Sequence, residues 1–287
     1  MKVINTINEL QKAVKDSGLL PLAFVPTMGA LHEGHISLVE KAVAECPITV
    51  VSIFVNPTQF NDKNDLKNYP RTLDKDLDLL GKVFREQDIV FTPSVEEMYP
   101  EEDKRIFRFG NLDNVMEALH RPGHFNGVGQ IVSRLFDIVK PDIAIFGLKD
   151  FQQLAVIKEL VKQTNDKVKI IGSPIIREAD GLAMSSRNML LEPEIRKNSS
   201  IIYKTIVKAA SMLKNAEISD AALYVKNEIN ALENFEVIYF EIVDDEQLIS
   251  VKSKREMSKD KKYFGCIAVK AGSIRLIDNI EIKDWSE

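Results

Sequence analysis

The first 175 residues alternate short apolar runs with segments of helical period. The apolar runs are nearly continuous and rich in β-branched residues, which is typical of strands buried on both faces. They lie at 22–26, 48–55, 88–93, 142–147 and 167–176. Segments with helical spacing lie between or beside them, at 36–45, 71–86, 128–140 and 151–163. This alternation predicts a parallel sheet with helices on both faces, because parallel strands need crossover connections.

The order of elements changes after about residue 175. Two helical stretches come first, at 194–215 and 220–233, and three strand-like stretches follow at 235–244, 263–271 and 273–279. Helices followed by strands are typical of an α+β unit. We therefore expect two domains, a Rossmann-like doubly wound α/β domain over residues 1–175 and a smaller α+β domain over residues 176–287.

Charge and hydropathy exclude several classes of protein. The 287 residues have a formal net charge of −5, whereas general nucleic-acid binders usually have a basic face. The longest apolar run, residues 48–55, is too short to cross a bilayer. Residues 1–18 have helical spacing but no uninterrupted apolar stretch of the signal-peptide kind. We expect a soluble cytoplasmic protein without nucleic-acid or membrane partners. Cys46 and Cys266 lie in separate apolar stretches, which predicts buried free thiols.

The sequence TMGALHEGH, residues 27–35, joins the first predicted strand to the first predicted helix. Gly29 and Gly34 permit tight turns, and the start of the helix should present free N–H groups to an anion. His32 and His35 are three residues apart, so that their imidazoles share a face if the turn is helical. We predict a phosphate-binding loop whose imidazole N–H groups support charge at an α-phosphorus. The alternative is a local polar cap. Neither a Walker A loop nor a GxGxxG fingerprint is present.

A second polar loop, MSSRN, occupies residues 184–188. Ser185 and Ser186 offer hydroxyl donors, and the guanidinium of Arg187 suits phosphate geometry. The alternative is an ordinary helix N-cap, since serine favours that position. Together with the histidine loop, this segment is predicted to hold the β- and γ-phosphates of a nucleotide.

Further polar side chains follow other predicted strands. They are Asn56 and Gln59 after the second strand, Lys149, Asp150 and Gln153 after the fourth, and Arg121 and His124 in residues 120–136. Each could be part of a cap or turn, but ligands of parallel sheets bind at the carboxyl ends of the strands. Lys149 would then offset phosphate charge, Asp150 would accept a bond from a ribose hydroxyl, and Gln153 would bind a small polar substrate.

HEGH resembles the HxGH signature of the nucleotidyltransferase superfamily, in which class I aminoacyl-tRNA synthetases pair it with a mobile basic loop. The full set of motifs resembles the pantoate–β-alanine ligase, or pantothenate synthetase, family. These motifs match in order and spacing from about residue 20 to the C-terminus: PTMGALHEGH, FVNPTQF, YPRT, RPGHFNGV, FGLKDFQQ, MSSRN and IRLIDN. The combination is highly specific, although HxGH alone is not.

The resemblance implies a two-step reaction. The pantoate carboxylate attacks the α-phosphorus of ATP, which gives pantoyl adenylate and pyrophosphate, and the amine of β-alanine then displaces AMP. Residues 1–175 would bind the nucleotide and pantoate, and residues 176–287 would form a lid that contains the MSSR loop. The resemblance also implies Mg²⁺ on the phosphates of ATP and a homodimer.

Roles for single residues follow from the same resemblance. The catalytic set would be His32, His35, Lys149 and Arg187. The ATP-binding set would be Met28, Gly29, Ala30, Leu31, His32, Glu33, Gly34, His35, Gly147, Leu148, Lys149, Asp150, Ile176, Met184, Ser185, Ser186 and Arg187. The pantoate-binding set would be Asn56, Gln59, Arg121 and Gln153, with Met28 against the methyl groups of pantoate. Asp76 would be a water-mediated partner of the metal, unless it lies on a solvated helix face.

Three departures from the family pattern and three rival functions remain. Leu148 stands where the family usually has glutamate, and QIVS (130–133) and MLLEPE (189–194) are atypical.

One rival function is that of another adenylyltransferase, which would need more cationic groups to bind a phosphorylated acceptor. A class I tRNA synthetase would need a tRNA-binding surface, which this acidic chain does not suggest. The third rival is a sensor that binds ATP without turnover.

Overall fold

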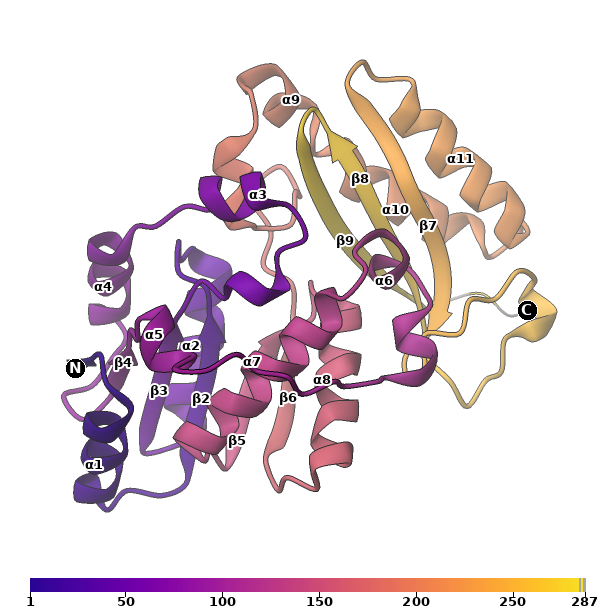
Figure 1. The fold of residues 1–287 in the computed structure, drawn as a ribbon. Helices are drawn as coiled ribbons and strands as arrows, with labels where there is room; N and C mark the ends of the chain where they lie inside the picture. Colours follow the sequence, from indigo (N-terminus) through magenta and orange to yellow (C-terminus); the bar gives the residue numbers. More distant parts are fainter. Residues whose placement is uncertain (284, 286–287) are drawn as a thin grey trace.

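The computed structural model describes residues 1–283 and residue 285, which are organised around two sheets (Figure 1). The larger sheet has six strands, all paired in parallel, in the order β1-β4-β3-β2-β5-β6. Its strands are β1 (Lys2–Ile4), β2 (Leu22–Thr27), β3 (Ile48–Ile53), β4 (Ile89–Phe91), β5 (Ile143–Gly147) and β6 (Lys169–Ser173). The five parallel strands predicted from the sequence are confirmed.

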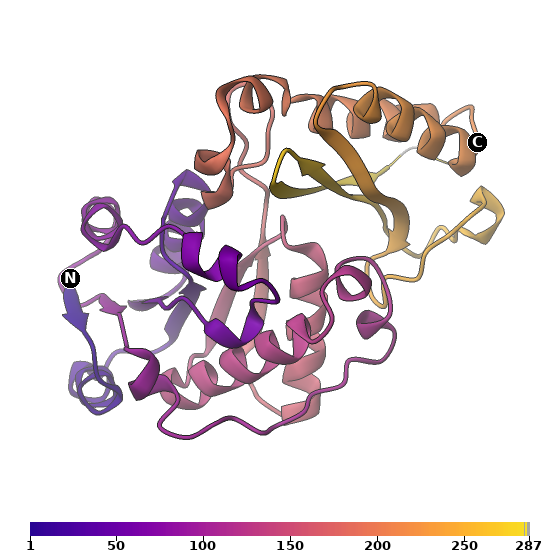
Figure 2. The same ribbon diagram turned by 45° about the horizontal axis from the view of Figure 1, so that its top comes forward.

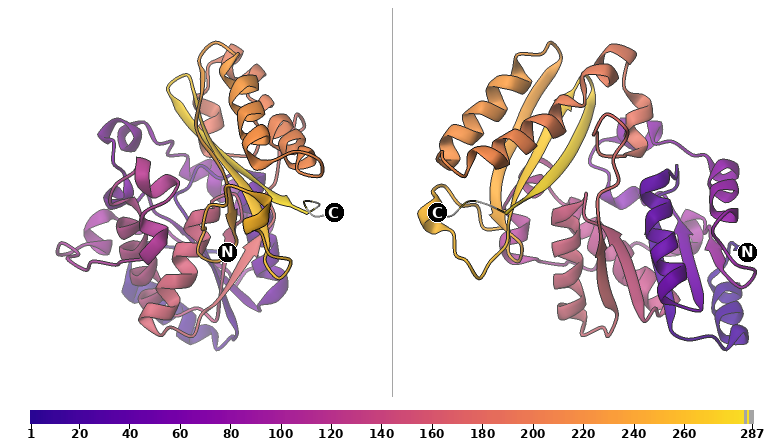
Figure 3. Two further views of the ribbon diagram at one scale, coloured as in Figure 1. Left: turned by 90° about the vertical axis from the view of Figure 1, so that its right-hand side faces the viewer. Right: turned by 180° about the vertical axis from the view of Figure 1, so that it is seen from behind.

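Helices cover both faces of this sheet because successive strand residues point in opposite directions. Leu22 and Phe24 of β2 pack into a core with α1 (Ile7–Ser17), α7 (His124–Val139) and α8 (Phe151–Thr164). Ala23 and Val25 pack into the core on the other face, with α2 (Glu33–Glu45) and α4 (Leu73–Gly81). The opposite views in Figures 1 and 3 show α7 and α8 on one face and α2 on the other. The doubly wound arrangement is confirmed.

The strand order reverses between β2 and β5. From β2 the chain continues to β3 and β4 on one side, whereas β5 and β6 lie on the other side. Crossovers that leave in opposite directions open a crevice at the carboxyl ends of the two central strands, and ligands of such sheets bind there. The turns after β2 and β5 contain the histidine loop and the Lys149–Asp150 turn.

The smaller sheet is antiparallel and consists of β7 (Phe235–Asp244), β8 (Tyr263–Ala271) and β9 (Ile274–Ile282). Figure 2 shows α10 (Ile201–Met212) and α11 (Ile218–Asn230) over its outer face, where they enclose a separate core. Its inner face packs on the larger unit, since the rings of Phe264 and Phe151 are 4.3 Å apart between centroids. The predicted smaller α+β unit is therefore confirmed as a layer that lies against the N-terminal end of α8.

Short elements complete the fold. They are α3 (Lys63–Asn68), α5 (Val95–Met98), α6 (Glu117–His120), α9 (Pro193–Asn198) and the 3₁₀ turns η1 (Pro57–Gln59), η2 (Gly110–Asp113), η3 (Ser186–Leu190) and η4 (Lys254–Glu256). Two details differ from the prediction. Residues 2–4 form an edge strand beside β4. This strand was not predicted, because three residues are too few to show a period. The helix predicted over 194–215 is split in two at Ser199 and Ser200.

Both cysteines are buried and free, as the sequence predicts. Burial raises the pKa of both thiols, so neither has the thiolate character of a reactive cysteine. In the part of the chain that the structure describes, every helix is too short or too polar to cross a membrane.

Candidate functional site

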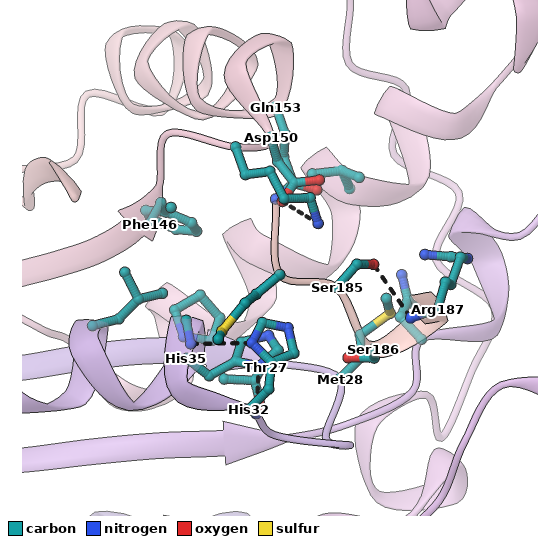
Figure 4. Close-up of a pocket in the computed structure, with 18 of the residues that line it drawn as sticks. Thr27, Met28, His32, His35, Phe146, Asp150, Gln153, Ser185, Ser186 and Arg187 are labelled. Carbon is teal, nitrogen blue, oxygen red and sulfur yellow. Dashed lines mark hydrogen bonds and ion pairs between the residues drawn. The ribbon is translucent and has the colours of Figure 1, made fainter. Parts of the chain in front are cut away.

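A cavity of about 200 Å³ lies where the strand order reverses (Figure 4). Its walls come from the carboxyl ends of β2, β3 and β5, from α7, and from the segment that leads into the smaller sheet. Most of the residues predicted for chemistry line it: Met28, His32, Gly34, His35, Asn56, Gln59, Gly147, Lys149, Asp150, Gln153, Ile176, Met184, Ser185, Ser186 and Arg187. The structure therefore brings together side chains that lie far apart in the chain.

The two histidines cap the N-terminus of α2. The Nδ1 atom of His32 accepts a hydrogen bond from the N–H of Gly34 at 3.1 Å, and Nδ1 of His35 accepts one from the N–H of His32 at 3.4 Å. An imidazole whose Nδ1 atom accepts has its proton on Nε2 when it is neutral. Each ring therefore has an Nε2–H donor that the cap does not use, and both rings line the cavity.

Burial keeps both imidazoles neutral. It lowers the pKa of His32 to about 4, with the charge of Lys149 as a further cause. Burial also holds the pKa of His35 well below its ordinary value, with His32 and Lys149 contributing. The ring centroids are only 4.1 Å apart, so two imidazolium charges here would repel strongly. At neutral pH the pair therefore offers two hydrogen-bond donors and no net charge.

The prediction of free backbone N–H groups at this helix start is wrong for the N-cap residue His32 and for Gly34, and two N–H groups of the preceding loop are also engaged. The N–H groups of Ala30 and Leu31 donate to Asp76, and those of His32 and Gly34 donate to the imidazoles. The polar cap considered as an alternative is thus present, and it does not exclude a phosphate site. The capping bonds hold the imidazoles at the helix N-terminus, where their Nε2–H groups are the donors available to the cavity.

Asp76, predicted as a water-mediated partner of the metal, does not line the cavity, nor does it lie on a solvated helix face. Its side chain is buried and accepts bonds from the N–H of Ala30 at 2.9 Å, the N–H of Leu31 at 2.8 Å and the hydroxyl of Thr72 at 3.0 Å. These bonds hold the histidine loop in shape. A Cβ at Gly29, where φ is 78°, would lie 3.0 Å from Oδ2 of Asp76, so the approach requires glycine.

The second loop touches the first. The hydroxyl of Ser186 donates to the carbonyl of Ala30 at 2.9 Å, and the hydroxyl of Ser185 accepts from the N–H of Arg187 at 3.2 Å. Ser185 is thus an N-cap, as its alternative role predicts, while its side chain still lines the cavity. Ser186 is buried, and its hydroxyl joins the two loops. Figure 4 shows this loop facing the histidines across the cavity.

Arg187 already has an acidic partner. Its Nη2 atom lies 3.0 Å from a carboxylate oxygen of Asp65 in α3, and its guanidinium lies 5.5 Å from the ring centroid of Tyr69. Lys149 has a looser contact, because its Nζ atom is 3.9 Å from the carboxylate of Asp150. Both cations line the cavity, and Asp65 competes with any anion for the Nε and Nη2 donors of Arg187.

The residues predicted to bind pantoate differ in how many hydrogen bonds their side-chain amides already make within the protein. Asn56 is fully buried. Its amide nitrogen donates to the side-chain oxygen of Gln59 and to the carbonyl of Gly127, and its amide oxygen accepts from the hydroxyl of Tyr99. It orients Gln59, whose Nε2 atom is also 3.0 Å from the sulfur of Met28. Within the described chain the amide of Gln153 has no hydrogen-bond partner, and Figure 4 shows it beside Asp150.

Arg121 lies outside this cavity. It borders an adjoining cavity of about 110 Å³ between the two sheets and lies 3.9 Å from Glu117. Burial lowers the pKa of its guanidinium. Five members of the predicted ATP-binding set also do not line the main cavity: Gly29, Ala30, Leu31, Glu33 and Leu148. Ala30 and Leu31 are buried behind the loop, and Leu148 packs against the larger core.

Sequence analysis missed the apolar wall of the cavity. It consists mainly of side chains from α7 and from two strand ends: Phe54, Val128, Ile131, Val132, Leu135 and Phe146. These residues also pack in the larger core, so their apolar spacing indicates only burial. The structure shows nearly every residue of α7 buried, which is more than the single apolar stripe of a surface helix requires.

In the part of the chain that the structure describes, groups of three or more His, Cys, Asp or Glu side chains that could hold a metal ion are absent. The cavity therefore offers cations and neutral donors rather than a ligand cage. Such a lining suits an anionic ligand, and its apolar wall suits a branched aliphatic group.

Comparison with known proteins gives one consistent family. A sequence model described as "Pantoate-beta-alanine ligase" matches residues 2–281. A protein of Bacteroides fragilis named pantothenate synthetase is 51% identical over 290 residues, which cover 99% of this chain and 100% of that protein. A crystal structure of pantothenate synthetase from Thermus thermophilus is 37% identical, with a TM-score of 0.89 and coverage of 98% and 99% of the two chains. A crystal structure described as pantoate-β-alanine ligase from Francisella tularensis complexed with β-γ ATP and β-alanine is 34% identical, with a TM-score of 0.76 and coverage of 98% and 97%.

Proposed function

Because this chain belongs to the pantoate–β-alanine ligase family, we propose that it carries out the family's reaction in the cavity at the carboxyl ends of β2 and β5. The reaction would proceed in two steps through a pantoyl-adenylate intermediate. The chain is an ATP-dependent ligase that forms the amide bond of pantothenate from pantoate and β-alanine. The adenylate is the proposed part. It converts a carboxylate, which resists attack by an amine, into an acyl group with a good leaving group.

In the first step a carboxylate oxygen of pantoate attacks the α-phosphorus of ATP. The bond from that phosphorus to the bridging oxygen breaks, and pyrophosphate leaves with the electron pair. The observation that most supports this assignment is the pair of unused Nε2–H donors of His32 and His35 in one cavity with Lys149 and Arg187. Fixed donors and cations stabilise charge that builds on phosphate oxygens. Because both imidazoles are neutral, we assign them hydrogen bonding rather than proton donation.

In the second step the amine of β-alanine attacks the acyl carbon. The new C–N bond forms, the acyl–oxygen bond to AMP breaks, and the amide nitrogen releases its extra proton to solvent. The Francisella tularensis structure is described as a complex with β-γ ATP and β-alanine, and we propose that this chain binds the same kinds of ligand. Closing the cavity around the adenylate would protect it from hydrolysis.

We assign the substrates to opposite walls. Lys149, Ser185 and Arg187 would contact the triphosphate, with Ser186 joining the loops behind them. Gly147 and Asp150 would hold the ribose, and the backbone of Ile176 would lie near adenine. Gln59 and Gln153 would bind the polar groups of pantoate, with Met28 and the α7 wall against its methyl groups. Asn56 would act by orienting Gln59, and Arg121 would contribute only through the adjoining cavity.

The size of the cavity supports a moving lid. At about 200 Å³ it is smaller than the roughly 300–1,000 Å³ typical of ligand sites. ATP and pantoate together need more room, so residues 176–287 would move away from residues 1–175 to admit them. When residues 176–287 close again, Ser185 and Arg187 would contact the phosphates. Residues 176–287 would thus act as the lid domain.

Mg²⁺ would enter as part of the magnesium–ATP substrate. The described residues offer no protein cage, and Mg²⁺ commonly keeps several waters while binding substrate phosphates. We also propose a cytoplasmic homodimer without nucleic-acid partners, on the basis of the family resemblance and the acidic net charge of −5. Light scattering of the purified chain would test the dimer.

The test of the mechanism is exchange of labelled pyrophosphate into ATP. We expect exchange that requires pantoate and Mg²⁺ but not β-alanine. Addition of β-alanine should give multiple turnovers, with AMP and pantothenate formed in equal amounts. Pantothenate formation without exchange would contradict a reversibly formed adenylate. Tight ATP binding without either activity would favour the sensor, and exchange that requires a phosphorylated acceptor would favour another adenylyltransferase.

A further inference from the structure

The motif IRLIDN has no role in the reaction described above. It forms most of β9 in the smaller sheet, and its last two residues, Asp278 and Asn279, are buried where the two sheets meet. The amide nitrogen of Asn279 donates to the carbonyl of Leu148 at 2.8 Å and to the carbonyl of Lys149 at 3.2 Å. One side chain of the smaller unit thus binds the backbone of the turn that presents Lys149.

This turn has few other restraints. The N–H of Leu148 donates to the carbonyl of Ser173 in the neighbouring strand β6 at 2.8 Å. Beyond it the chain enters α8, whose N-cap residue Asp150 makes no capping bond with its side chain. The two bonds from Asn279 therefore fix the peptide groups on either side of the Lys149 Cα atom.

Asn279 is itself held by an ion pair. Its backbone N–H donates to Asp278 at 2.8 Å, and the Asp278 carboxylate binds both terminal nitrogens of Arg177 at 2.6 and 2.9 Å. Arg177 lies on the segment that leads to the Ser185–Arg187 loop, and it also donates to the carbonyl of Gly181 at 3.1 Å. Its guanidinium stacks 3.6 Å from the ring centroid of Tyr203. A bidentate pair of this kind is rigid.

We propose that Asn279 is a positioning residue for Lys149, which it places only when the smaller sheet is packed on the turn after β5. This inference rests on the proposed contact of Lys149 with the phosphates of ATP. The network joins the turn after β5 to the start of the second loop through β9. Docking of the smaller sheet would therefore set Lys149 and the loop of Arg187 together, and an open form would have a poorly placed Lys149.

The test compares Asn279→Asp with Asn111→Ala. The substituted aspartate would keep the size of the side chain but offer no N–H donors, and its charge would face two carbonyl oxygens. Asn111 provides a matched control, because its amide also donates across the two units, to the carbonyl of Gln247 at 2.9 Å, away from the cavity. We expect Asn279→Asp to lower kcat of pantoate-dependent pyrophosphate exchange by about 10- to 100-fold, as misplacement of a reacting group does. KM for pantoate should not change, and Asn111→Ala should stay within about twofold.

A double-mutant cycle with Lys149→Ala tests whether Asn279 acts through Lys149. If it does, adding Asn279→Ala to Lys149→Ala should cost less than about threefold, although Asn279→Ala alone costs about tenfold or more. Asn279→Ala also serves if the aspartate variant does not fold. Equal losses from Asn279→Asp and Asn111→Ala, or independent losses in the cycle, would overturn the inference alone. Absence of exchange in the unsubstituted chain would overturn it together with the proposed mechanism.

Discussion

The loop at residues 27–35 and the loop at residues 184–188 both bring polar groups to the cavity, but these groups differ in what they already bind. In the first loop, backbone bonds to Asp76 and to Nδ1 of each histidine fix the imidazoles and leave their Nε2–H groups for a ligand. In the second loop the cation itself is engaged, since Arg187 is paired with Asp65. The first loop is preorganised, whereas the proposed contact of the second loop with ATP would compete with the Arg187–Asp65 pair.

This difference has a physical basis in the burial of each group. The cap satisfies Nδ1 of each neutral imidazole, and each ring lines the cavity, where solvent or a ligand can accept a bond from its Nε2–H group. A guanidinium that is partly buried is stabilised by an acidic partner, and Asp65 supplies one in the free protein. Preorganised donors contribute to the transition state without rearrangement. If Arg187 exchanges Asp65 for a phosphate, as proposed, ATP binding would be linked to the contacts of the second loop.

The largest effect should come from removing an Nε2–H donor while keeping the cap. Asn is an excellent N-cap residue, so His32→Asn should still accept from the N–H of Gly34 but cannot reach the phosphates. We expect kcat for pyrophosphate exchange to fall by about 100- to 1,000-fold, as for loss of an oxyanion-hole donor. His32→Ala should lose the same activity and, in addition, about 1 kcal/mol of unfolding free energy. Retention of activity within about tenfold in His32→Asn would show that this imidazole does not contact the reacting phosphate.

A smaller effect is expected from weakening the hydrogen bonds between Asp76 and the backbone of the same loop. Asp76→Asn leaves one amide N–H facing a backbone N–H, so we expect a loss of about 1–3 kcal/mol of unfolding free energy in urea. Exchange activity should fall about tenfold because the histidines shift. Asp74→Asn, on the exposed side of the same helix, is the control. The Mg²⁺ concentration for half-maximal activity should stay unchanged; a marked increase in Asp76→Asn alone would restore Asp76 as a metal partner.

The fold and the composition of the cavity follow largely from the sequence, because their signals are local. Alternating apolar runs and helices predict the parallel sheet, and polar residues at strand ends predict where Gln59 and Lys149 meet. The roles of Asp76 and Asn279 could not be predicted in this way. Each acts through hydrogen bonds to backbone atoms of a segment that is distant in sequence, and backbone atoms leave no trace in residue identity.

The partner of Arg187 is a similar case. Asp65 lies 122 residues away on a helix of six residues, in a stretch of charged and amide side chains with no apolar pattern. Nothing in such a stretch indicates which carboxylate is used. The geometry of the closed form decides it, and so the state of the second loop could be known only from the structure.

Releasing Arg187 should have a modest effect in the opposite direction. Asp65→Asn removes the competing carboxylate, and a half-exposed pair of this kind contributes about 0.2–1 kcal/mol. We therefore expect KM for ATP to fall by up to about fivefold, with kcat little changed. Asp62→Asn makes the same change of charge nearby and preserves the N-cap of α3, so it should leave KM unaltered. Steady-state kinetics at several ATP concentrations would decide, and an unchanged or higher KM in Asp65→Asn would contradict the exchange of partners.

The last prediction concerns the stability of the preorganised loop in the free protein rather than its activity. Burial lowers the pKa of His32 to about 4 from an ordinary value of 6.5. Between these values the unfolded chain binds more protons than the folded chain, so unfolding free energy should decrease as the pH falls from about 6.5 to about 4. The contribution is fully present above about pH 6.5. His32→Asn should make this decrease shallower than in the unsubstituted chain. Urea titrations across this range would measure both slopes, and equal slopes in His32→Asn and the unsubstituted chain would mean that this imidazole is charged in the folded loop.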